Sequence, residues 1–141
     1  MTLFVPRGCR GIVSLDGVIQ LNRVLLPIDH DPTPQEVVLR AVRAAEAFGD
    51  DTVEMLLLHV NGGEFPVFDR PPSKVCVWKE LRRDGDVVAS ILDAAQEADL
   101  IIMATEGRHG IFDALRGSVT ERVIQDAPCP VLAIPAPSMI E

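Results

Sequence analysis

Apolar and polar positions along this chain alternate between two periodicities. Short, mostly apolar runs predict buried strands, because a parallel strand that is covered on both faces has no polar side. Between these runs, apolar residues recur every three or four positions, which predicts helices with one buried face. The predicted strands are Arg23–Ile28, Val53–Val60, Val75–Trp78, Leu100–Met103 and Val131–Ile134.

Helix start and stop signals lie between the predicted strands. Thr33-Pro34-Gln35-Glu36 is typical of a capping box with a proline in the first turn, and the apolar stripe that follows ends at Gly49. Asp86 is expected to cap a second helix, and Ser118 with Glu121 to cap a third. The buried faces of the first two helices are predicted to carry Val38, Ala41, Val42, Ala45, Val88, Ile91, Leu92 and Ala95.

Strands that alternate with helices favour an α/β fold with a parallel sheet. We expect a doubly wound, flavodoxin-like parallel sheet of five strands in the order 3-2-1-4-5, although Pro27 indicates a strand end or a missing ladder bond. Folds of this type bind ligands outside the carboxyl ends of the strands, where the strand order reverses. Here that point lies between the first and fourth strands, which lead to Asp29 and to Met103-Ala104. The sequence therefore predicts a ligand site between those residues.

Two segments depart from the regular alternation. The link Asn61–Lys74 contains two glycines and three prolines, so we expect a shortened second crossover with at most a turn around Phe65–Asp69. Residues 1–21 form an N-terminal extension to the predicted domain, residues 22–141. Within this extension, Gly11–Gln20 resembles a β-hairpin with Asp-Gly at its turn. The hairpin extends the sheet, covers the face that lacks a helix, or pairs with a partner subunit.

The composition narrows the class of protein. The chain has 141 residues, 48% of them hydrophobic, and a formal net charge of -8, which is typical of one globular domain without nucleic acid or an anionic membrane as partner. No apolar run reaches the about 20 residues that span a bilayer, and the N-terminus has no secretion signal, so we expect a cytoplasmic protein. Cys9, Cys76 and Cys129 form no CxxC pair and are expected to be reduced thiols, with Cys129 buried.

A glycine-bearing loop follows the fourth predicted strand. Gly107, Gly110 and Gly117 lie between that strand and the helix that Ser118 is expected to cap. A helix N-terminus presents free backbone N–H groups and the positive end of the helix dipole, and glycine lets the backbone approach a phosphate closely. The loop therefore predicts an anion site that includes Gly107 and Ser118.

From about Asn22 to Pro135 the chain resembles the universal stress protein family. Nine residues separate Gly107 from Gly117-Ser118, as in the nucleotide-binding signature of that family. Further segments occur in the family's order: Arg23–Asp29, Leu57–Val60, Gly85-Asp86, Ala98–Met103 and Ala127–Leu132.

The resemblance implies a site for ATP or another adenine nucleotide, with Mg²⁺ bound together with the nucleotide. It implies that Asp29 contacts the adenosine part and that the main chain of Val60 bonds to adenine. Met103 and Ala104 are implied to flank the ribose. The positions implied to hold the phosphates are Gly107, Gly117, Ser118 and Val119.

The resemblance also implies a homodimer through the last strand, Val131–Ile134, because an apolar edge strand needs a cover. Two positions depart from the family pattern. Ala104 has a methyl group where the family usually has glycine, and Glu106 brings a carboxylate close to the expected phosphates. Arg108, His109 and Arg116 are positioned in sequence to offset that carboxylate.

Three functional hypotheses follow. The first is a dimeric, regulatory adenine-nucleotide-binding stress protein without efficient catalysis. The second is a nucleotide-free protein of the same family that acts as an interaction module for other proteins. The third is a weak ATPase, since the sequence has no Walker motif, nucleophile elbow or Cys-His pair that would support fast hydrolysis.

Several of these residues also suit purely structural roles. Asp29 is also suited to cap the turn before Thr33, and His59 is expected to be a hydrogen-bonded core residue. The histidines and aspartates have no recognised zinc-ligand spacing. We therefore expect no dedicated metal site.

Overall fold

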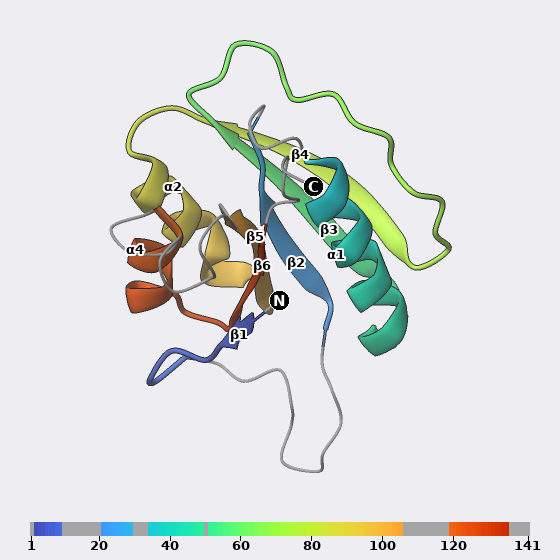
Figure 1. The fold of residues 1–141 in the computed structure, drawn as a ribbon, viewed down its shortest axis with the longest axis horizontal. Coiled ribbons are helices and arrows are strands. Elements are labelled where there is room, and N and C mark those ends of the chain that lie inside the picture. The colour runs from blue at the N-terminus through green and yellow to red at the C-terminus, as the bar shows by residue number, and fades with distance from the viewer. Residues whose placement is uncertain (1, 10–20, 30–33, 50, 106–118, 136–141) are drawn as a thin grey trace, which may run out of the picture.

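In the computed structural model, residues 2–9, 21–29, 34–49, 51–105 and 119–135 are described. They form one sheet with helices on both faces (Figure 1). The strands are β1 (Thr2–Phe4), β2 (Arg23–Pro27), β3 (Val53–Val60), β4 (Cys76–Arg83), β5 (Leu100–Thr105) and β6 (Val131–Pro135). The helices are α1 (Gln35–Phe48), α2 (Val87–Ala94), the 3-10 helix η1 (Ala95–Glu97) and α4 (Val119–Asp126).

The strand order of the sheet is β1-β6-β5-β2-β3-β4. From β2 to β6 the pairings are all parallel. Only β1 runs antiparallel to its neighbour, with Leu3 opposite Leu132 of β6. The protein is therefore an α/β fold of the flavodoxin-like kind, with its strand order reversing between β2 and β5, and with one additional strand at the β6 side.

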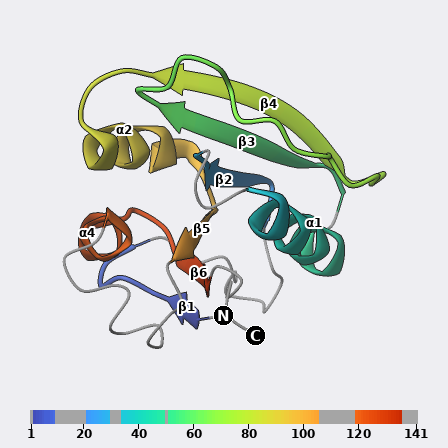
Figure 2. The ribbon, with the colours of Figure 1, turned by 45° about the horizontal axis from the view of Figure 1, so that its top comes forward.

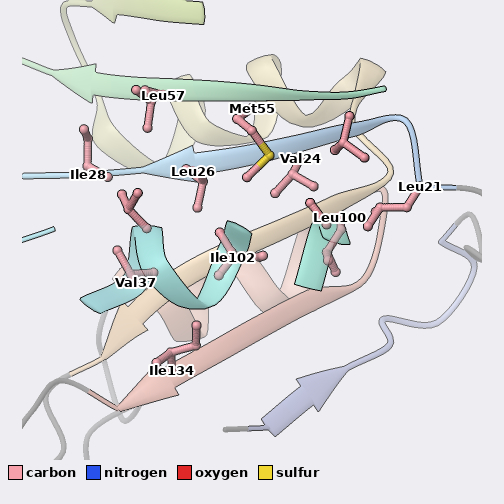
Figure 3. Close-up of a cluster of buried hydrophobic side chains, with 14 residues drawn as sticks. Leu21, Val24, Leu26, Ile28, Val37, Met55, Leu57, Leu100, Ile102 and Ile134 are labelled. Atoms are coloured by element: carbon pink, nitrogen blue, oxygen red, sulfur yellow. The ribbon is translucent and has the colours of Figure 1, made fainter. Parts of the chain in front are cut away.

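Helices cover the sheet from both sides. Figure 2 shows α1 on one face and α2 with α4 on the other. Because side chains of a strand alternate between the faces, Leu25 packs toward α2 and α4, whereas Val24 and Leu26 pack toward α1. Figure 3 shows the buried cluster beneath α1, to which α1 contributes Val37 and the strands and their ends contribute Ile28, Ile102 and other residues.

The second crossover has no helix, as expected from its glycines and prolines. Residues 61–75 link β3 to β4 without helix or strand, and Phe65 and Phe68 from this link pack against the buried cluster beneath α1. Gln35 at the start of α1 exchanges two hydrogen bonds with the main chain of Asp69, at 2.9 and 2.8 Å. Two aromatic side chains thus cover part of the face that a crossover helix would have covered.

The strand β4 is longer than its sequence pattern predicts. It continues past Trp78 through a charged stretch to Arg83 and pairs with β3 along all eight of its residues. β4 ends the sheet on this side, so charged side chains along it remain in water. The expectation that the strand ends at Trp78 is therefore wrong, because an edge strand needs no continuous apolar run.

The helix ends agree in part with their sequence signals. Asp86 caps α2, with its side chain accepting a 2.8 Å hydrogen bond from the N–H of Ala89. Gly49 follows the end of α1 and donates its N–H to the carbonyl of Ala45. Pro34 occupies the N-cap of α1 and provides no side-chain cap, while the expected caps Thr33 and Ser118 lie outside the described residues.

The N-terminal strand changes the interpretation of the sheet edge. Thr2–Phe4 pairs with residues 131–133 of β6, so the expectation that β6 is a free edge strand is wrong. The alternating side chains of this short segment allow it to pair, since Phe4 packs against the cluster beneath α2 and α4 and Leu3 is exposed. The expected hairpin at Gly11–Gln20 lies outside the described residues.

Candidate site at the carboxyl ends of the strands

Asp29 lies at the carboxyl end of β2, in the middle of the sheet. The preceding residue, Ile28, is buried, and its N–H donates a 2.8 Å hydrogen bond to the carbonyl of Leu58 in β3. The side chain of Asp29 is exposed. The end of β2 is thus held by β3 up to Ile28, and the next residue presents a carboxylate to solvent.

His59 ties the carboxyl ends of β2 and β3 together. Its imidazole is 2% exposed, and Nδ1 lies 3.1 Å from the carbonyl oxygen of Ile28. A carbonyl only accepts hydrogen bonds, so Nδ1 carries the proton in this contact. The ring also meets Phe65 edge-on, with centroids 5.9 Å apart. The prediction that His59 is a hydrogen-bonded core residue is confirmed.

Val60 ends β3 next to this contact. Its side chain is half-buried and packs toward α2 and α4, on the face opposite to His59. In the register of β3 and β4, Val60 is opposite Arg83. Since Asp29 follows β2 and Val60 ends the adjacent parallel strand β3, they lie at the same edge of the sheet.

The carboxyl end of β5 contributes the third part of the site. Met103 is buried and packs toward α2 and α4, whereas Ala104 is half-buried and packs toward α1. Val119 begins α4 and is 39% exposed. The other predicted phosphate-binding residues lie outside the described residues: Gly107, Gly117 and Ser118.

A pair of hydrogen bonds between Asn61 and Gly85 forms a clamp between the carboxyl ends of β3 and β4. The sequence analysis does not predict this clamp. The side-chain amide of Asn61 donates to the carbonyl of Gly85 at 2.6 Å, and its Oδ1 accepts from the N–H of Gly85 at 2.7 Å. Asn61 has φ of 60°, a left-handed conformation that asparagine tolerates better than most residues. An asparagine followed by two glycines directly after a strand is a turn signal that would have pointed to it.

Neither the cysteines nor a cluster of metal ligands is found at this site among the described residues. Burial raises the pKa of the Cys76 thiol, an effect opposed by a hydrogen bond with Ser73 and supported by the nearby Glu46 carboxylate. Cys129 is fully buried, as expected. Among the residues with described positions, no three His, Cys, Asp or Glu side chains gather as metal ligands. No helix in that part of the chain is long and apolar enough to cross a membrane.

Comparison with known proteins finds similarity to one family. Residues 72–135, which include β4, α2, β5, α4 and β6, match the model of the universal stress protein family. A universal stress protein of Methanocaldococcus jannaschii is 52% identical over 42 residues, which make up 30% of this chain and 25% of that relative. These matches support a member of the universal stress protein family. The matched segment spans only a quarter of the length of that relative.

Solved structures of universal stress proteins share the fold. One from Archaeoglobus fulgidus has a TM-score of 0.62 at 21% identity, with 83% of this chain and 45% of that chain covered. Another, solved in complex with cAMP, has a TM-score of 0.60 at 18% identity, with 83% of this chain and 98% of that chain covered. The similarity in sequence and the shared fold therefore agree, and the candidate site lies where the strand order of this fold reverses.

Proposed function

We propose that the protein is a cytoplasmic regulatory module that binds an adenine nucleotide at the carboxyl ends of β2, β3 and β5, without efficient catalysis. The observation that carries this proposal is the placement of Asp29, Val60 and Met103 at or near the carboxyl ends of three neighbouring strands. The related protein in complex with cAMP supports the choice of an adenine nucleotide.

Each residue supplies one kind of contact in this proposal. The exposed carboxylate of Asp29 accepts hydrogen bonds from the adenosine part. The main chain of Val60 meets adenine, while Met103 and Ala104 flank the ribose. The phosphates lie against Gly107, Gly117, Ser118 and Val119, at the N-terminus of α4, where free N–H groups favour an anion.

Magnesium enters this proposal only together with the phosphates. Asp29 is a single exposed carboxylate, and no three acidic or histidine side chains gather among the residues that the structure describes. One carboxylate with phosphate oxygens and several waters is a coordination that Mg²⁺ commonly accepts. The ion would neutralise phosphate charge and so reduce the repulsion between the phosphates and the carboxylate of Glu106.

Titration calorimetry tests the nucleotide site directly. With ATP, ADP, AMP and cAMP at millimolar concentration, we expect heat from at least one nucleotide and a tenfold or greater loss of affinity in Asp29→Ala. Asp84→Ala is the matched control, because Asp84 is also an exposed aspartate after a strand of the same sheet. No heat with any nucleotide would contradict the proposal.

The second hypothesis, a nucleotide-free interaction module, is favoured by Ala104. Its methyl group is half-buried at the end of β5, where the implied ribose lies. If wild type gives no heat and Ala104→Gly does, this methyl group is the block to binding and the second hypothesis holds. The weak ATPase is distinguished by phosphate release: release no faster than from Gly117→Trp excludes it.

We also propose a homodimer through the Val131–Ile134 edge. β1 covers residues 131–133 of that edge, so a second copy has to displace β1 from β6 or pair beside it. The exposed side chains of Leu3 and Val5, at 49% and 65%, lie on or next to this cover. The proposal therefore makes β1 a competitor for the dimer contact.

A further inference from the structure

The two central strands of the sheet separate before either of them ends. β2 pairs with β5 only at Val24–Leu100 and Leu25–Ile101. Yet β2 continues in register with β3 to Pro27, and β5 continues in register with β6 to Thr105. Figure 3 shows β2 and β5 running apart toward Ile28 on one strand and beyond Ile102 on the other. Both strands are held on their outer sides while the ladder between them stops.

The direction of the main-chain groups explains where it stops. In a parallel ladder, successive residues of a central strand turn their N–H and C=O groups to alternate neighbours. The N–H of Ile28 bonds to Leu58 of β3, and the carbonyl of Arg23 accepts from Asp99 at the start of β5, at 2.9 Å. Residue 27 therefore faces β5, as residues 23 and 25 do.

Proline occupies the position that should donate next. After the pair Leu25–Ile101, the ladder register brings residue 27 opposite Met103, so its N–H would bond to the carbonyl of Ile102. Proline has no N–H. The ladder thus ends at the first position on this side of β2 where the chain has no donor.

We propose that Pro27 is a positioning residue that keeps the carboxyl ends of β2 and β5 apart, so that an adenine nucleoside can enter between Asp29 and Met103. The inference deepens the proposed function and rests on it for the ligand. With a donor at residue 27, the ladder extends by at least one bond toward Thr105 and draws the two strands together. The missing bond at Pro27 leaves room for the ligand.

Hydrogen exchange in the full-length Pro27→Ala variant tests the separation without any nucleotide. We expect the new amide of Ala at position 27 to be protected to about the same extent as the amide of Leu25, because it bonds to Ile102. A rigidifying role of proline alone would leave this amide unprotected. Exchange at the rate of an open loop amide therefore overturns the proposal.

Calorimetry then tests the link to the ligand. We expect Pro27→Ala to bind nucleotide at least tenfold more weakly than wild type, whereas Pro128→Ala, a proline outside the described helices and strands, binds as wild type does. Protection of amide 27 with unchanged affinity overturns the role in ligand access. Failure of the wild type itself to bind overturns the proposed function, while the exchange result still decides the ladder. If Pro27→Ala does not fold, Pro27→Val provides the same donor in a residue that favours strands.

Discussion

The backbone of Gly62 lies directly against the imidazole of His59. A Cβ placed on Gly62 would be 1.4 Å from His59 Nε2, far inside any allowed contact. His59 is buried, and its Nδ1 bonds to the carbonyl of Ile28, one residue before Asp29. The turn after β3 thus needs glycine because the ring that joins the ends of β2 and β3 fills the space beside it.

We predict that Gly62→Ala lowers the free energy of unfolding by about 1–3 kcal/mol, the usual cost of overpacking a filled site. Chemical denaturation measures the loss. Gly63→Ala is the matched control, since a Cβ on Gly63 meets nothing within 4 Å, and we expect it to unfold as wild type does. Equal stability of the two variants would mean that His59 moves aside at no cost.

The link between β3 and β4 offers a spectroscopic test. Trp78 is the only tryptophan, and its ring lies 6.5 Å from that of Phe68, with the guanidinium of Arg70 5.7 Å from its centre. We expect Phe68→Ala to shift the emission of Trp78 to longer wavelength, because water reaches the indole, and to cost about 1 kcal/mol for the lost half-buried ring. Val67→Ala is the control, as Val67 is 91% exposed. An unchanged spectrum for both variants would show that the link does not shield Trp78.

The cap of α2 gives a third prediction. Asp86 accepts a hydrogen bond from the N–H of Ala89, so Asp86→Ala should reduce stability by about 1 kcal/mol. Asparagine is as good a cap, and Asp86→Asn should keep most of the stability. Urea titration of both variants, with Asp84→Ala for the effect of removing a nearby charge, separates capping from electrostatics. A similar loss in Asp86→Asn and Asp86→Ala would attribute the effect to charge.

Some features of the fold can be predicted from the sequence, and others cannot. The parallel strands and the buried faces of α1 and α2 follow from local periodicity, and the topology then places Asp29 and Met103 at the same edge of the sheet. The pairing of β1 with β6 and the clamp between Asn61 and Gly85 join residues far apart in the chain. The turn signal that starts at Asn61 marks one end of the clamp, but no local pattern identifies the distant partner in either contact, so the sequence does not predict them.

Within the candidate site, the strand ends follow from the sequence, whereas the role of Pro27 follows only from the structure. The strand ends are predictable because apolar runs stop there, and Pro27 is an unusual residue within one of these runs. Its significance depends on which neighbour residue 27 faces, and this follows only from the hydrogen bonds of Arg23 and Ile28. The phosphate-binding residues around Gly107 and Ser118 remain predictions from their spacing.

The edge formed by β1 and β6 gives the last prediction. Phe4 is opposite Val131 and packs toward α2 and α4, so Phe4→Asp puts a carboxylate against an apolar cluster and should release β1. The uncovered N–H and C=O groups of β6 can then pair with a second copy, because an apolar open edge is a template for another strand. Sedimentation velocity should show a larger dimer fraction for Phe4→Asp than for wild type. Val5→Asp, which adds the same charge at a 65% exposed position next to β1, should sediment as wild type does. A smaller dimer fraction in Phe4→Asp would instead mean that β1 forms part of the dimer contact.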